Sequence, residues 1–161
     1  MGGMNARSGT TGTRGSAGPR ERLGYAWLAL TLAFAIHVLD EADRDFATIY
    51  QPLTAAVRTH FPRLPFPQLS FGGWLTSLAF VVIVLLSVSG AVFHAGSVVR
   101  RVAYAYAALM AANACAHIVG TLQANEVVAG TWSGALLLVA ATALLVAARR
   151  TAPGHCHPLS R

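Results

Sequence analysis

The chain has 161 residues, of which 55% are hydrophobic and only 11% are charged. A soluble domain has about a quarter charged residues, so this composition excludes an ordinary water-soluble domain and indicates a membrane protein. All basic residues are Arg, and the formal net charge is +6. Most of these Arg residues flank apolar segments, where basic residues set membrane topology. The expected partner is therefore membrane lipid and not nucleic acid.

Residues 1–22 are rich in Gly, Ser, Thr and Arg, and we predict a disordered tail because they cannot bury a core. Four apolar segments follow, at 23–41, 72–93, 101–123 and 127–148. Each is near the ~20 residues that a membrane-spanning helix needs. The predicted fold is all-α, with a four-helix transmembrane bundle over 23–150 and a flexible C-terminal tail over 151–161.

The Arg residues are distributed unequally between the two sides of the predicted membrane. One side holds Arg7, Arg14, Arg20, Arg22, Arg100, Arg101, Arg149, Arg150 and Arg161. The other side holds only Arg44, Arg58 and Arg63, together with most of the acidic residues. The positive-inside rule then predicts a multi-pass protein of the cell membrane with both termini in the cytoplasm.

An alternative interpretation of the N-terminus is a signal peptide. Arg20 and Arg22 precede the first apolar run, and Ala33-Phe34-Ala35 fits a small-residue cleavage site. Cleavage after Ala35 would leave an odd number of spans. The long polar tail before the run and the three spans after it favour a retained helix.

The predicted outer loop, residues 42–70, contains four of the seven prolines. Pro52 is expected to open a short helix whose apolar side would hold Leu53, Ala56, Val57 and Phe61. The Pro-rich stretch 61–67 forces an extended path. The loop is either an interfacial segment that covers the outer face or a plain connector.

Ionisable side chains stand where the first and third apolar segments should lie in the membrane, and such groups mark a functional site by default. His37, Asp40 and Glu41 have the spacing i, i+3, i+4, which places them on one face of a helix. In the third segment, Asn113, His117 and Thr121 also share a face, at i, i+4, i+8. Both faces can direct polar groups into a bundle.

The two histidines are predicted to share one depth. His37 is fifteen residues after Arg22, and His117 is sixteen after Arg101. At about 1.5 Å per residue, both lie ~22–24 Å from the cytoplasmic anchor. The polar starts of the second and fourth segments, which include Ser133, fall at the same level. We therefore predict that the first and third spans meet at a common site in the outer half of the membrane.

The segment His37-Val38-Leu39-Asp40-Glu41 resembles the H-x-x-E-E motif of the HXXEE family of small membrane proteins. That family has a second, later histidine, to which His117 is similar, and a Y-x-P-G-like motif near the last span. Residues 131–134 stand at that place and keep only the glycine, and Asp40 replaces the first glutamate. The resemblance covers residues 23–148 and implies a catalytic membrane domain without an established reaction.

Our first hypothesis is a metal-dependent membrane enzyme with an amphipathic or lipid-like substrate. His37 and His117 would be metal ligands, and Asp40 or Glu41 would complete a site for zinc or non-haem iron. The other carboxylate would act as general base on a bound water. Asn113 and Thr121 would support the site, Asn113 through a bond between helices.

Other interpretations of the same residues remain open. The second hypothesis is a non-catalytic site for a metal or a lipid, or a proton-coupled carrier working as a homo-oligomer. A structural accessory subunit is a third possibility. Cys115 is offset from His117 by about 160° around a helix and is predicted to be a packing residue. The tail sequence His155-Cys156-His157 could bind a metal, but Pro and Gly on both sides favour an unstructured end.

Overall fold

The computed structural model describes residues 17–43, 47–63, 70–94 and 96–151, which form helices and turns with no strand among them. The helices are α1 (Pro19–Asp43), α2 (Ala47–His60), α3 (Phe71–Ser87), α4 (Ser89–Val92), α5 (Ser97–Ala124) and α6 (Thr131–Arg150). The all-α prediction is therefore confirmed for the described part of the chain.

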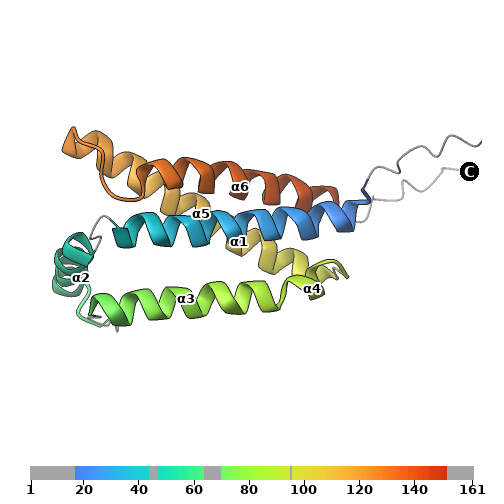
Figure 1. Ribbon diagram of the computed structural model, residues 1–161, viewed down its shortest axis with the longest axis horizontal. Helices are drawn as coiled ribbons and strands as arrows, with labels where there is room; N and C mark the ends of the chain where they lie inside the picture. The colour runs from blue at the N-terminus through green and yellow to red at the C-terminus, as the bar shows by residue number, and fades with distance from the viewer. Residues whose placement is uncertain (1–16, 44–46, 64–69, 95, 152–161) are drawn as a thin grey trace, which may run out of the picture.

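Three of the helices, α1, α5 and α6, are long and apolar enough to cross a membrane. Helix α3 is also apolar but has only 17 residues. Val88, in right-handed helical conformation, separates α3 from α4, and α4 continues from the end of α3 (Figure 1). The membrane character is thus supported by three helices, whereas a fourth span made by α3 and α4 stays a prediction.

Helix α1 begins at Pro19, earlier than the predicted start at residue 23. Proline suits the first turn of a helix because its missing N–H would have no partner there. The backbone N–H of Gly18 also donates to the Glu21 carboxylate at 2.9 Å. The end of the predicted tail is therefore helical, while residues 1–16 and 152–161 lie outside the described residues.

The other boundary corrections fall on connecting segments. Helix α6 begins at Thr131 and not at residue 127, because the chain turns through Asn125 and Gly130, which have φ of 54° and 80°. Helix α2 begins before Pro52, which lies inside it and does not open it. Of its predicted apolar side, Phe61 is exposed and the Leu53 side chain is outside the described residues, as are residues 64–69.

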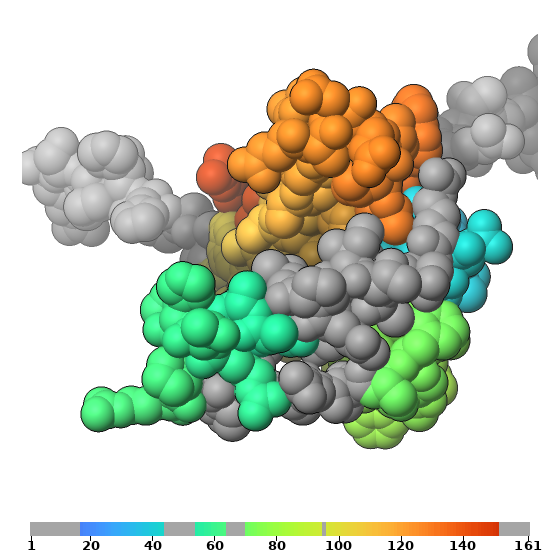
Figure 2. Space-filling view, turned by 90° about the vertical axis from the view of Figure 1, so that its left-hand side faces the viewer, coloured from blue at the N-terminus to red at the C-terminus, as the bar shows by residue number. Residues whose placement is uncertain are grey.

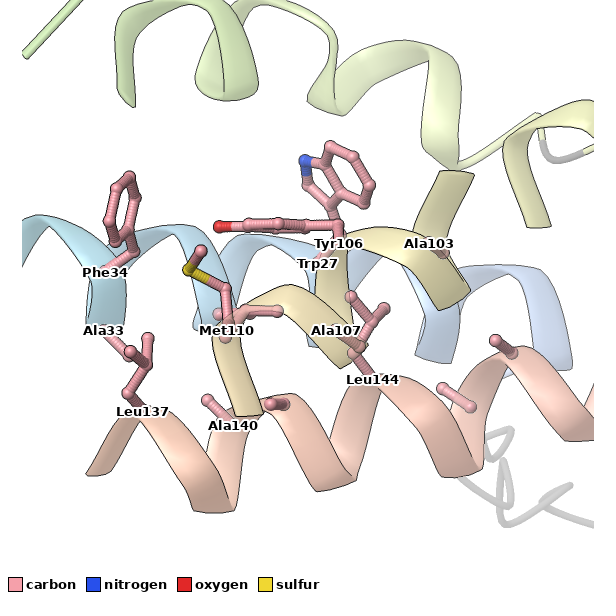
Figure 3. Close-up of a cluster of buried hydrophobic side chains, with 14 of the residues drawn as sticks. Trp27, Ala33, Phe34, Ala103, Tyr106, Ala107, Met110, Leu137, Ala140 and Leu144 are labelled. Atoms are coloured by element: carbon pink, nitrogen blue, oxygen red, sulfur yellow. The ribbon is translucent and has the colours of Figure 1, made fainter. Parts of the chain in front are cut away.

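Helix α6 packs against both α1 and α5, and α3 packs against α1. Small residues let α6 pack closely in the bundle, because small side chains allow membrane helices to approach each other. The fully buried ones on α5 and α6 are Ala107, Ala114, Ala141 and Ala148. Figure 3 shows the larger core side chains, with Leu137 and Leu144 of α6 facing α1 and α5. The long helices therefore form one packed unit, to which α3 is attached at one side.

The two ends of the bundle differ in chemistry. Helix α1 starts and α6 finishes at the same end (Figure 1), where Arg22 and Arg150 both line a cavity of about 390 Å³. At the opposite end lie α2 and the turn between α5 and α6, drawn in teal to green and in orange in Figure 2. The polar side chains singled out in the sequence gather near this second end.

Candidate metal centre

Three buried side chains from α1 and α5 meet near the end of the bundle. His37 and Glu41 are one turn apart on α1, with 3.2 Å between His37 Nε2 and Glu41 Oε1. His117 Nε2 of α5 lies 2.8 Å from the same carboxylate oxygen. The two imidazole rings lie edge to face with their centroids 4.8 Å apart. The predicted meeting of His37 and His117 is confirmed.

The group is enclosed by the bundle. His37 is 1% exposed, Glu41 5% and His117 8%. In the described part of the chain, these residues form the one group of three His, Cys, Asp or Glu side chains whose ligand atoms all lie within 4.8 Å of one another. Ionisable groups are rarely buried unless they pair with each other or hold a metal, so this arrangement calls for a chemical reason.

A backbone carbonyl fixes the orientation of His117. Its Nδ1 lies 2.8 Å from the oxygen of Ala129, in the turn before α6. A carbonyl oxygen can only accept a hydrogen bond, so Nδ1 must carry the hydrogen. In the neutral ring, Nε2 then carries the lone pair, and this lone pair is directed at Glu41.

A hydroxyl fixes His37 in the same way. The Ser133 hydroxyl donates to Asp40 Oδ2 at 2.7 Å, and its oxygen is 2.8 Å from His37 Nδ1. Since the single hydroxyl proton is used on Asp40, Ser133 accepts the Nδ1 hydrogen of His37. The lone pair on Nε2 then faces Glu41 and the Asn113 side-chain amide, which donates to it at 2.9 Å.

Two imidazole lone pairs and one carboxylate oxygen therefore converge. Such a set needs a positive species between its members, either a metal ion or a proton. Zinc bonds of about 2.0–2.1 Å in a tetrahedron would hold ligand atoms ~3.3 Å apart. The separation of 3.2 Å between His37 and Glu41 already fits. The separation of 2.8 Å between His117 and Glu41 would have to lengthen by about 0.5 Å.

Gly130 closes the site on the side of the α5–α6 turn. A Cβ atom added there would lie 2.8 Å from His117 Cε1 and Nδ1 and 2.9 Å from His37 Cε1. The residue also has a φ of +80°, a backbone conformation that residues other than glycine rarely adopt. Bare backbone at this position is thus what allows the turn to pack on both rings.

Asp40 has a different position from the one predicted. As a metal ligand it would have to join the two histidines, but its carboxylate accepts the Ser133 hydroxyl and it is not in the three-residue group. The next residue, Glu41, points toward His117. Asp40 therefore lies behind His37, where a carboxylate orients a ligand and increases its basicity.

The two predicted supporting residues have separate functions. Asn113 links α5 to α1 through His37, as predicted for a hydrogen bond between helices. Thr121 lies farther along α5, where its hydroxyl is 2.6 Å from the Thr131 hydroxyl and accepts the Val128 N–H at 3.3 Å. Thr121 thus holds the α5–α6 turn through these two bonds.

Other His and Cys residues stand apart from the centre. His60 and His94 each bond a carbonyl one turn earlier in the chain, Ala56 and Gly90. Cys115 is exposed and not packed inside the bundle, which corrects its predicted place. The segment 155–157 lies outside the described residues.

The sequence reasoning did not assign Ala129, Gly130 or Ser133 to the site. Ser133 had a visible signal, because it is polar and opens the last helix at the depth of the histidines. Gly130 is recognisable only as a turn glycine. The contribution of Ala129 is a backbone carbonyl, which leaves no mark in the residue type.

A scan of family models, a search of curated proteins and a search of solved structures each found no match to this chain.

Proposed function

We propose that this chain is an integral membrane protein in which His37, Glu41 and His117 bind a divalent metal ion, and that the centre belongs to an enzyme. The observation that carries the proposal is the fixed orientation of both rings. Each Nδ1 is tied to an acceptor, so both Nε2 lone pairs face one carboxylate.

The donor set favours zinc or non-haem iron, because both accept imidazole together with carboxylate. Structural zinc sites usually have four protein ligands, whereas catalytic sites have three and keep one position open. Here three side chains converge, and His37 and Glu41 also line a cleft of about 700 Å³. A fourth position reached from this cleft would suit a water molecule or a substrate oxygen.

A metal bound here would supply Lewis acidity and a coordinated water of lowered pKa. The residues of the chain would orient and tune it. Asp40, through Ser133, would make the Nε2 of His37 a stronger electron-pair donor to the metal. Glu41 has two carboxylate oxygens, so it can hold a metal with one and accept a proton from water with the other. The reaction class that follows is metal-assisted attack of water on an amphipathic substrate.

Membership of the HXXEE family is part of the proposal, supported by the H-x-x-D-E segment at 37–41 and the second histidine at 117. The proposed topology has four spans, counting α3 and α4 together, with both termini in the cytoplasm. It is supported by the Arg residues at one end of the bundle and the polar centre near the other.

The direct test is the metal content of the purified protein. His155, Cys156 and His157 are first replaced by Ser, and a tag without histidine is used, so that the tail cannot bind metal. We expect one zinc or iron ion per chain by mass spectrometry of the elements. His117→Ala should lose it, and His94→Ala, at a histidine that bonds the Gly90 carbonyl, should retain it.

A proton is the second candidate for the positive species, and one distance favours it. Without a metal, 2.8 Å between His117 and Glu41 requires a shared proton. The proton-coupled or lipid-binding alternative gains if the wild type, purified without chelators and resupplied with zinc or iron, never holds metal while the His117→Ala protein is stable in the membrane.

A further inference from the structure

An apolar cleft begins at the metal centre and runs along α1, α3 and α5. Its volume of about 700 Å³ is in the usual range for small-molecule sites, ~300–1,000 Å³. Figure 3 shows Trp27, Phe34, Tyr106 and Met110 on the side of α1 and α5 that faces α3, and these side chains line the cleft. The cleft is therefore lined in part by core side chains and is continuous with the site.

Polarity in the cleft is confined to one end. His37, Glu41 and Asn113 lie there. Farther along, the Trp27 indole N–H already donates to the Leu85 carbonyl, and the Tyr106 hydroxyl is turned to Thr31 of α1. From Asn113 to Val102, α5 contributes about 16 Å of wall at ~1.5 Å per residue. The cleft is therefore long and apolar, with polar side chains at one end.

The cleft exists because α3 and α5 pack against different helices. Helix α3 is attached to α1, and α5 packs on α6. Val81 of α3 and Val102 and Leu109 of α5 line the cleft and are exposed. In a membrane such apolar walls face lipid chains. A hydrocarbon chain can therefore enter from the side without crossing water.

The direction of the cleft matches a lipid of the outer leaflet. His37 is six residues from the end of α1, which corresponds to ~9 Å, so the polar end lies close to the outer interface of the proposed topology. The apolar part runs from there toward the middle of the membrane. Lipid head groups and acyl chains have the same order along this direction.

We propose that the cleft binds an acyl chain of a lipid, with the acyl carbonyl oxygen at the His37 end. The placement of this carbonyl rests on the proposed metal centre. His37 Nε2 has one lone pair, so it cannot both bind a metal and accept the Asn113 amide. Metal binding would free the Asn113 N–H groups for the carbonyl oxygen, and Asn113 would become the residue that orients the substrate.

The test uses the full chain in phosphatidylcholine nanodiscs with a light-activated diazirine in the middle of an acyl chain. One arm uses a fatty acyl methyl ester, and the other uses a phosphatidylcholine, so that the two sources of an acyl chain are distinguished. Focused labelling of residues 81–85 and 102–109 by the phosphatidylcholine probe is expected, and focused labelling by the methyl ester alone would show that the cleft takes a single acyl chain and not a membrane phospholipid. Ala105→Phe, which places a ring in the cleft, should remove this label.

Ala108→Phe is the matched control, because Ala108 is also exposed on α5 but does not line the cleft. This variant should be labelled like the wild type. Label spread evenly over the lipid-facing sides of α3 and α5, or unchanged by Ala105→Phe, would overturn the proposal. Cross-links between two copies at this face would also overturn it, since a second chain would then fill the cleft.

The same labelling is repeated with metal removed and with His117→Ala. Focused label in the absence of any metal binding would support the acyl cleft while the metal enzyme fails. Bound metal without focused label would have the opposite meaning. The acyl cleft and the metal centre are thus tested independently.

Discussion

At the scale of single residues, the Ser133 hydroxyl selects which nitrogen of His37 faces the centre. It uses its proton on Asp40 and therefore accepts from Nδ1 of the ring. Without it, the imidazole could rotate or change tautomer and direct its lone pair elsewhere. Ser133 and Asp40 should consequently affect metal affinity without being ligands.

We predict that Ser133→Ala weakens metal binding by about 10- to 100-fold, the usual cost of losing a partner of a ligating histidine. Metal affinity is measured by competition with a chromophoric chelator. Thr142→Ala is the control, because this hydroxyl is on the same helix and donates to the Leu138 carbonyl one turn earlier. Equal affinities for both variants would contradict the proposed link through Ser133.

Asp40 allows a second residue-scale prediction. Asp40→Ala should lower metal affinity to a similar extent as Ser133→Ala, and the double variant should be little worse because the two residues act in series. Asp40→Glu keeps the carboxylate and should retain most of the affinity. Additive losses in the same chelator competition would show that the two side chains act separately.

The sequence could predict His37, Glu41 and His117 because helix spacing and depth bring them to one level. It could not decide between Asp40 and Glu41, since neighbouring residues lie about 100° apart on a helix and either could have turned toward His117. The choice depends on Ser133 of α6, a partner more than ninety residues away. Such a contact has no local signature.

At the scale of elements, the turn between α5 and α6 determines the shape of the site. The point where this turn ends and α6 begins is hard to predict from the sequence, because residues 127–129 are apolar and continue the pattern of a span. Left-handed Asn125 and Gly130 interrupt that pattern. The turn then presents the Ala129 carbonyl to His117.

We predict that Gly130→Ala destabilises the protein and disturbs the metal centre. The left-handed backbone alone costs about 1–2 kcal/mol for a residue with a side chain, and the new methyl would meet both imidazoles. Gly134→Ala is the matched control, because its methyl would have ordinary contacts of 3.7 Å or more. Inside a helix, alanine is also favoured over glycine by ~1 kcal/mol.

Thermal unfolding in detergent, read together with metal content, tests this pair. Gly130→Ala should melt earlier and hold less metal, whereas Gly134→Ala should match or exceed the wild type. If both variants behave alike, the turn does not press on the rings as described.

At the scale of the whole molecule, the asymmetry of charge predicts the orientation in the membrane. The start of α1 and the end of α6 share one end of the bundle (Figure 1), with Arg22 and Arg150 nearby. Reporter fusions at the C-terminus and near Arg58 should report the cytoplasmic and the outer side, respectively. An external C-terminus would contradict the topology and place the centre in the inner half.

The centre is shared between two parts of the chain that meet only in the folded protein. His37 and Glu41 belong to the part that contains α1, α3 and α4, while His117, Asn113 and Ser133 belong to α5 and α6. Residue 95 separates the two parts in the sequence. Membrane helices can insert independently and associate afterwards.

Metal content can therefore serve as a reporter of assembly. We predict that fragments 1–94 and 96–161, expressed together as a split protein, associate and bind metal, while neither does so alone. Co-purification through a tag on one fragment would measure the association, and metal analysis of the purified complex would measure metal binding. Metal retained by a single fragment would assign the ligands to one half. The expected result would mean that the centre can form only after the second part of the chain has been synthesised and has joined the first.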